Sequence, residues 1–185
     1  MREIQTKTKQ RLTISLVPQH DATNAWDGGL LSILQHIDFL VLNELETKSI
    51  TKFKCEDSDE GEMKFIRHAS EFFSQYNRTC FIVTRGSKGA IVIHGGQIIH
   101  QQTTSPEIDN PIDPTGAGDA FAAGFLHGYL SYQAKSENKD PCVLSTDAVK
   151  TGMQWACAAG TCYASRSKCS FEERQHRANT EQYHR

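Results

Sequence analysis

Apolar runs in this sequence are short, and none is long enough to cross a bilayer. Runs such as Phe81-Ile82-Val83 fall far below the roughly 20 apolar residues that a spanning helix needs. Residues 1–9 lack the apolar segment of a secretory signal peptide. An excess of one charge is lacking too, because 20 basic side chains face 22 acidic ones and the net charge is −2. We therefore expect a soluble, cytoplasmic protein with no nucleic-acid and no membrane partner.

Paired metal-binding or redox cysteines are also lacking. Among the six cysteines no C-x-x-C pair occurs, and without a secretory signal we expect free thiols. A zinc site can be drawn from Cys157, Cys162, Cys169 and His176, but these spacings match no common ligand pattern. The chain also lacks the G-x-x-x-x-G-K-[ST] sequence of a P-loop, which excludes a nucleotide site of that type.

The chain does contain an alternation of strand and helix patterns within 185 residues, a length that suits one domain. Short apolar runs predict buried strands, helix-like spacing predicts amphipathic helices, and Gly95-Gly96 predicts a tight hairpin turn. The expected strands are 12–18, 38–42, 80–84, 90–94 and 97–101, and the expected helices are 26–37, 43–50, 62–76, 117–132 and 145–165. This order predicts an α/β fold with a mostly parallel sheet flanked by helices.

Three segments between or within these elements carry separate predictions. The acidic stretch 55–62 is expected to be a solvated loop, and its spacing does not fit an EF-hand. The last helix is rich in small residues around Ala158, Ala159 and Gly160, which predicts close packing against a neighbour. The tail 171–185 is polar and aperiodic, so we expect it to be frayed.

The stretch 113–121 combines two glycines with a carboxylate at the start of a predicted helix. Gly116 and Gly118 let backbone approach a ligand closely, and a helix start offers unpaired N–H groups and a positive dipole end. Together with Ala117 they predict an anion site suited to a phosphate. Asp119 would lie in the first turn, where we expect it to accept a proton from the group that attacks the anion. The alternative is a glycine-rich turn that Asp119 caps.

This stretch resembles the second signature of the PfkB (ribokinase-like) family of sugar and nucleoside kinases, D-T-x-G-A-G-D. Five residues match in register, and Pro114 stands where the family commonly has Thr. The resemblance implies that Asp119 is the general base and that Gly116, Ala117 and Gly118 form the anion hole. It also implies a monovalent cation, potassium, at the carbonyls of Asp113 and Thr115.

Two further stretches resemble motifs of the same family and occur in the family's order. Asn43 and Glu46 resemble its N-x-x-E motif, which implies that Glu46 acts on Mg²⁺ through water and that Asn43 helps to place the phosphates. The alternative is a helix cap formed by the same two residues. Residues 84–90 resemble its T-x-G-x-x-G turn, which implies nucleotide contacts from Thr84, Gly86, Ser87 and Gly89. An ordinary turn at a strand end is the alternative there.

Residues 15–21, with Trp26, resemble a segment of the 2-keto-3-deoxygluconate kinase-like branch, in which a strand leads into a loop on the sugar side. Plain loop roles for His20 and Asp21 are an equal alternative. The whole resemblance covers roughly residues 12–170. Family chains are longer, roughly 300 residues, and we find no counterpart of their Gly-Gly sugar-binding signature or lid. We therefore expect a ribokinase-like catalytic domain at 1–170, truncated at its N-terminus, and a tail at 171–185.

The resemblance implies an ATP-dependent and Mg²⁺-dependent kinase that phosphorylates a sugar hydroxyl, and a homodimer of the full-length form stays open. The nearest enzymatic alternative is an adenosine-like nucleoside kinase. The alternative from another class is a catalytically incompetent remnant that binds nucleotide. Retention of Asp119 argues against the remnant, since a decayed site has no chemical use for that carboxylate.

Overall fold

The computed structural model describes residues 12–54, 59–102, 115–136 and 144–165. Five strands form one sheet in the order β1-β2-β3-β4-β5. Strands β1 to β3 pair in parallel and β3 to β5 pair antiparallel, so the sheet is mixed. The bounds are Ser15–Leu16 for β1, Phe39–Asn43 for β2, Cys80–Thr84 for β3, Ala90–His94 for β4 and Gln97–Gln102 for β5. The α/β fold is confirmed, with its parallel part limited to three strands.

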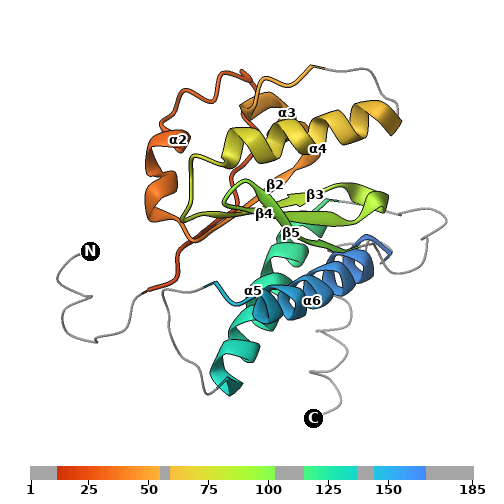
Figure 1. The fold of residues 1–185 in the computed structure, drawn as a ribbon. Helices are drawn as coiled ribbons and strands as arrows, with labels where there is room; N and C mark the ends of the chain where they lie inside the picture. The colour runs from red at the N-terminus through yellow and green to blue at the C-terminus, as the bar shows by residue number, and fades with distance from the viewer. Residues whose placement is uncertain (1–11, 55–58, 103–114, 137–143, 166–185) are drawn as a thin grey trace, which may run out of the picture.

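Helices cover both faces of this sheet, as Figure 1 shows. The short helices α2 (Leu30–Ile33), η1 (Leu34–His36) and α3 (Glu44–Ile50) lie on one face with α4 (Asp59–Phe73). The long helices α5 (Ala117–Lys135) and α6 (Thr146–Ala164) lie on the other. A 3-10 turn, η2 (Gly86–Lys88), follows β3 at the end of the sheet where α4 begins. The sheet is thus the middle layer of three.

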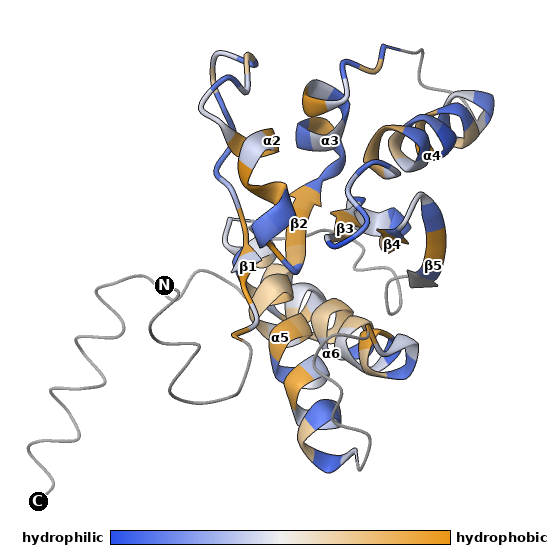
Figure 2. Cartoon of the chain, turned by 60° about the vertical axis from the view of Figure 1, so that its left-hand side comes forward, coloured by the Kyte–Doolittle hydropathy of each residue, from blue (hydrophilic) through white to orange (hydrophobic). Residues whose placement is uncertain are grey.

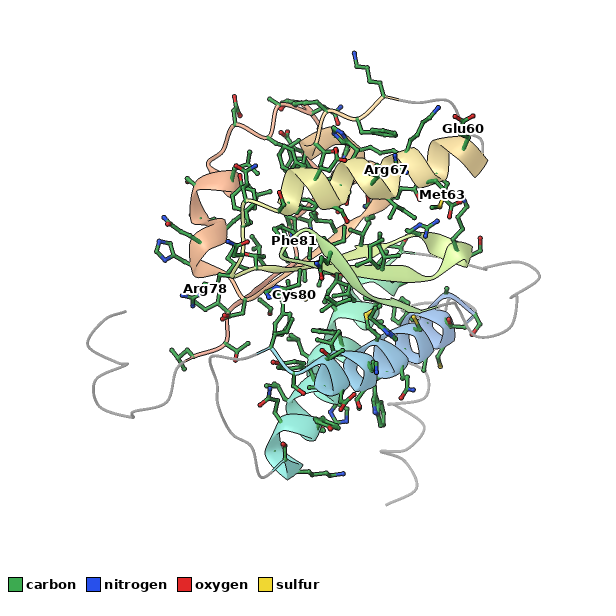
Figure 3. The ribbon with its side chains drawn as sticks, in the orientation of Figure 1. Glu60, Met63, Arg67, Arg78, Cys80 and Phe81 are labelled. Atoms are coloured by element: carbon green, nitrogen blue, oxygen red, sulfur yellow. The ribbon has the colours of Figure 1, made fainter. Side chains whose placement is uncertain are left out.

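Alternation along β3 divides the core into two clusters. Cys80 and Ile82 belong to the cluster that packs on α5 and α6, whereas Phe81 and Val83 belong to the cluster under α3 and α4. Figure 3 labels Cys80 and Phe81, whose side chains leave consecutive positions of the strand toward opposite faces. Because both faces are covered, β3 is apolar at every position from 80 to 83 rather than at alternate ones.

The long helices pack closely because glycines stand at their contact. A Cβ added at Gly124 would lie 2.7 Å from the backbone oxygen of Trp155, and one added at Gly152 would lie 2.9 Å from the Phe125 ring. Real Cβ atoms do not approach so closely, so only glycine fits at these two positions. The prediction of a close neighbour for the small-residue helix is confirmed.

The hairpin prediction is confirmed as well. His94 pairs with Gln97 across Gly95 and Gly96, whose φ angles are +55° and +74°. Two successive positive φ angles are what a type I′ turn requires, and glycine meets that requirement without strain.

Several predicted elements shift at their ends, and three of these differences have identifiable causes. The predicted strand 12–18 reduces to β1, because only Ser15 and Leu16 pair with β2. The predicted helix 26–37 begins only at Leu30, because Trp26 and Gly29 adopt positive φ angles of +52° and +84°.

Figure 2 shows both hydrophilic and hydrophobic residues along α4, as is typical of a helix that buries one side.

The third difference concerns the acidic stretch. Helix α4 begins at Asp59 and ends at Phe73 rather than spanning 62–76, so residues 59–61 belong to a helix and not to a solvated loop. The carboxylate of Glu62, which was predicted to begin this helix, is paired with Arg85 and Lys88. Residues 55–58 of that stretch lie outside the described residues, as does the tail 171–185. In the described part of the chain, no helix combines the length and apolar character that spanning a membrane requires.

Candidate nucleotide and catalytic site

Two of the predicted motifs meet at the carboxyl ends of parallel strands. Asn43 ends β2, Thr84 ends β3, and the two residues are register partners in the parallel pair. The Thr84 hydroxyl donates to the carbonyl of Leu42 over 3.4 Å, which ties the two strand ends together. Ligands of open α/β sheets bind outside the carboxyl ends of the strands, so this is where a nucleotide contact is expected.

Asn43 and Glu46 form a complete capping box at the start of α3. The Asn43 side chain accepts a hydrogen bond from the backbone N–H of Glu46 over 2.7 Å, and the Glu46 carboxylate accepts one from the backbone N–H of Asn43 over 2.8 Å. Glu46 is buried and Asn43 is exposed. The cap that the sequence offered as an alternative is therefore formed, and its bonds fix the Glu46 carboxylate at the strand end.

The turn after β3 is held by backbone hydrogen bonds around two glycines with positive φ angles. Gly86 has φ +56° and Gly89 has φ +84°, a region that side-chain-bearing residues avoid. The N–H of Arg85 donates to the carbonyl of Gly89 over 2.8 Å, and the N–H of Gly89 donates to the carbonyl of Gly86 over 3.0 Å. Gly86 and Ser87 are exposed, so their backbone faces solvent at the edge where a ligand would lie.

The start of α5 presents an open set of N–H groups. Gly116 is the N-cap with φ +84°, and the first helical bond runs from the N–H of Ala120 to its carbonyl over 3.0 Å. No side-chain cap bond closes this helix start. A Cβ added at Gly118 would meet nothing within 4 Å, and Asp119 is exposed in the first turn. The helix start at which an anion site is predicted is thus open, with a carboxylate beside it, and the alternative, a turn capped by Asp119, is not formed.

Packing directs this helix start toward the strand ends. The rings of Phe125 and Tyr129, later in α5, lie 5.1 and 4.7 Å from the ring of Phe39, the first residue of β2. Phe121, nearer the helix start, belongs to the same buried cluster as Val41, further along β2. The helix therefore begins toward the carboxyl ends of β2 and β3, beneath the sheet in Figure 1.

Two residues at this site carry no signal that sequence reasoning picked up. Tyr163 in the last turn of α6 lies against the helix start, since a Cβ added at Gly116 would be 3.1 Å from its ring. Arg85, inside the T-x-G-x-x-G stretch, is paired with Glu62 from α4. The sequence did hold a signal for the pairing of Arg85 with Glu62. A basic residue between a buried strand and a glycine turn needs an acidic partner, and the acidic residues at the start of α4 offer one.

The remaining predicted site residues stand as follows. Asp113 lies outside the described residues, and Thr115 is exposed just before Gly116. Asp21 accepts hydrogen bonds from Thr23 and Trp26, and these bonds, led by that of the Thr23 hydroxyl, lower the pKa of its carboxyl. Asp21 thus holds its own loop in shape, which is the plain loop role that the sequence left as an alternative to a role on the sugar side.

The described side chains also bear on metal and thiol chemistry. Within the described ranges no group of three or more His, Cys, Asp or Glu side chains could hold a metal ion. Cys80, Cys157 and Cys162 are free thiols, as expected. Burial raises the pKa of the Cys157 thiol to about 11, so it stays protonated at neutral pH.

Comparisons with known proteins place the chain in a family. The profile of the pfkB family carbohydrate kinases matches residues 2–173. A fructokinase of Escherichia coli is 31% identical over 111 residues, which cover 60% of this chain and 32% of the fructokinase. A cytidine kinase of Thermococcus kodakarensis is 28% identical over 121 residues, which cover 65% of this chain and 40% of the cytidine kinase. The chain thus spans well under half the length of these relatives.

A solved structure shares the fold. The fructokinase of Vibrio cholerae, a double mutant with fructose, ADP and a potassium ion bound, superposes with a TM-score of 0.59 at 19% identity. The superposition covers 83% of this chain and 44% of the fructokinase.

Proposed function

The chain belongs to the pfkB family of carbohydrate kinases, and from that premise we propose that it carries the ATP-binding and proton-accepting part of a kinase that phosphorylates a sugar hydroxyl. The observation that carries the proposal is the start of α5. It combines uncapped N–H groups, open space over Gly118 and the exposed carboxylate of Asp119. The cytoplasm, where ATP is made and used, is the compartment in which we propose that the reaction takes place.

In the proposed reaction the acceptor hydroxyl oxygen bonds to the γ-phosphorus of ATP while the bond from that phosphorus to the bridging oxygen breaks. ADP leaves with the electron pair, and the hydroxyl proton passes to Asp119 as general base. The backbone N–H groups of Gly116, Ala117 and Gly118 stabilise the charge on the transferring phosphoryl. Because a helix terminus is rigid, these donors need no reorganisation when charge develops.

The nucleotide would lie along the strand ends. Thr84, Gly86, Ser87 and Gly89 supply the turn that approaches the phosphate chain, and Asn43 stands beside Thr84 on the neighbouring strand. Positive φ angles at Gly86 and Gly89 turn the backbone sharply there, and the absence of side chains lets a ligand approach.

The residues present fit Mg²⁺ held mainly by water and phosphate. The described residues offer no three-ligand cluster, and Mg²⁺ commonly keeps several waters while contacting one or two carboxylates and the substrate phosphates. Glu46, fixed by its capping box, is the carboxylate that would take such an outer contact. When bound, the ion would neutralise charge on the phosphates.

A monovalent cation at the carbonyls of Asp113 and Thr115 is part of the same proposal. The support is the motif around Gly116 and the potassium ion named for the fructokinase of Vibrio cholerae. Pro114, which stands where the family commonly has Thr, removes one backbone donor and fixes φ at its position.

A nucleoside is the second candidate acceptor. The relatives include a fructokinase and a cytidine kinase at similar identity, which supports both acceptor classes equally. A remnant that binds nucleotide without catalysis is the candidate outside enzymes, and the exposed Asp119 speaks against it.

The test is ADP release from ATP in the presence of fructose, ribose, 2-keto-3-deoxygluconate, adenosine or cytidine, each in potassium, sodium and a bulky organic cation. Asp119→Asn should lower the acceptor-dependent rate at least about a hundredfold, the lower end of what general acid–base catalysis contributes. ADP affinity should change little, because the backbone donors remain.

Asp147→Asn is the matched control, since Asp147 also lies in the first turn of a 19-residue helix and is exposed. It should leave the rate unchanged. The outcome is judged by the acceptor-dependent rate of each variant divided by that of the wild type, so a slow absolute rate does not affect the comparison. A near-normal rate in Asp119→Asn would show that another group accepts the proton.

A further inference from the structure

A chain of ion pairs surrounds the turn after β3. The side chain of Arg85 is 1% exposed, and its Nη2 atom donates to the Oε1 atom of Glu62. The other carboxylate oxygen of Glu62 accepts from Lys88 Nζ over 2.7 Å. Arg85 Nε lies 3.8 Å from Glu44 Oε2. The other oxygen of Glu44 pairs with Lys48 over 2.7 Å.

These pairs join three elements that the fold brings together at one end of the sheet. Glu62 belongs to the first turns of α4, and Glu44 is the first residue of α3, directly after Asn43. Arg85 connects both to the turn that carries Gly86 and Gly89. One buried guanidinium therefore links the two motifs to which nucleotide contacts are assigned.

Stability alone is a poor reason for this arrangement. Burying a charge costs desolvation energy, which an ion pair often only balances. Among the described residues the Nε–H of Arg85 has no hydrogen-bond partner, and an unsatisfied buried donor is itself unfavourable. A well-packed apolar side chain would stabilise the turn as well, so the pairs point to a need for a fixed geometry.

The backbone of Arg85 shows what that geometry is. Its N–H donates to the carbonyl of Gly89 over 2.8 Å, and its carbonyl accepts from the N–H of Lys88 over 3.1 Å. The glycines of this turn are free to adopt many conformations when unconstrained. Anchoring the Arg85 side chain on α4 therefore limits the conformations of the whole turn.

We propose that Arg85, held by Glu62, is a positioning residue that keeps the Gly86–Lys88 turn in the shape that receives the nucleotide. This inference rests on the proposed function, because the ligand of the turn is the nucleotide of that reaction. Neutralising Glu62 should loosen the turn and lower nucleotide affinity, although Glu62 lies on a different helix and belongs to neither motif.

The experiment compares Glu62→Gln with Glu60→Gln in the 185-residue chain. Glu60 lies on the same helix two residues earlier, near the start of α4 in Figure 3, and its carboxylate pairs with Lys64 over 2.6 Å. Both variants thus remove one ion-paired carboxylate from α4, and only Glu62 is paired with residues of the turn, Arg85 and Lys88. The readouts are amide hydrogen exchange of residues 85–89, ADP affinity by calorimetry, and melting temperature.

In Glu62→Gln we expect the amides of Arg85 and Gly89 to exchange roughly tenfold faster and the dissociation constant for ADP to rise roughly tenfold. A change of about tenfold is the effect expected from losing a hydrogen bond to a charged group. Glu60→Gln should match the wild type in both. Arg85→Lys keeps the charge but not the planar fork, and it should resemble Glu62→Gln.

Faster exchange with unchanged ADP affinity would overturn the inference and leave the pairs a purely structural role. Unchanged exchange and unchanged affinity would overturn it as well. A wild-type chain that binds no ADP would instead overturn the proposed function, and the exchange rates would then describe the turn alone.

Discussion

At the scale of single residues, Gly116 and Gly118 have different reasons to be glycine. Gly116 has φ +84° and lies against Tyr163, so a side chain there meets both backbone strain and a ring at 3.1 Å. Gly118 is the second residue of α5 and faces open space. The first glycine is required by the fold, whereas the second is required only if a ligand approaches it.

This difference gives a paired prediction. Gly116→Ala should cost about 1–2 kcal/mol of stability, the penalty of a left-handed residue that carries a Cβ. Gly118→Ala should not lower the melting temperature, since alanine favours a helix over glycine by about 1 kcal/mol. Its methyl group should nevertheless weaken ADP binding by obstructing the N–H groups. Thermal denaturation and calorimetry measure the two effects, and normal ADP binding by Gly118→Ala would place the phosphate elsewhere.

At the scale of elements, the capping box of α3 combines a structural and a proposed chemical role in one carboxylate. Asn43 and Glu46 exchange two hydrogen bonds, and Glu46 is only 6% exposed. Glutamine also serves at the third position of a capping box. Replacing Glu46 by Gln therefore removes the charge and keeps the cap.

Glu46→Gln should thus leave the melting temperature nearly unchanged and raise the Mg²⁺ concentration needed for half-maximal ATP binding or turnover. Asn43→Ala is the complement, and it should cost about 1 kcal/mol of stability through loss of the cap. Unaltered Mg²⁺ dependence in Glu46→Gln would leave Glu46 with the cap alone.

Local sequence predicted the elements where local forces decide. The apolar runs at 80–84 and 90–94 and the Gly95-Gly96 turn carry their own signals, and the strands and hairpin formed there. The predicted start of the helix over 26–37 was wrong, because the spacing of Leu30, Ile33 and Leu34 carries no information about the positive φ at Gly29. Asp59 and Glu60 read as loop residues by composition, yet acidic residues suit the first turn of a helix.

The site was predictable in part for the same reason. Asn43, Thr84 and Gly116 stand in motifs that can be read along the chain, and the parallel register brings the first two side by side. The pairing of Arg85 with Glu62 joins residues 23 positions apart, and Tyr163 of α6 lies against Gly116 at the start of α5. Contacts of this kind depend on the packed layers and leave no local pattern.

At the scale of the whole molecule, the ion pairs at the turn predict how stability depends on pH. The hydrogen bond from Lys88, and then that from Arg85, hold the pKa of Glu62 below its ordinary value of 4.5. Since the folded pKa is the lower one, the pair contributes its stability fully above pH 4.5 and loses it as the pH falls through the folded pKa. Asp21, whose pKa is also lowered, adds to the same acid loss.

The pairing of Glu62 with Lys88 also makes stability depend on pH in the basic range, where the dependence has the opposite direction. The Glu62 carboxylate raises the pKa of Lys88 above 10.5, so this contribution is present below pH 10.5 and is lost as the pH rises through the folded pKa. Melting temperatures measured from pH 3 to pH 11 should therefore show a smaller change at both ends in Glu62→Gln than in the wild type. Equal curves would mean that the pair contributes nothing to stability in solution.

The central claim is that one nucleotide site is built from the start of α5 and the ends of β2 and β3. The most direct test is an ADP titration, with Mg²⁺, of the isotope-labelled chain, followed through its backbone amide resonances. The account predicts that the shifts cluster at residues 43–46, 84–89 and 116–119, while the outer side of α4 around Arg67 stays unchanged. Shifts confined to other surfaces, or none at all at saturating ADP, would contradict it.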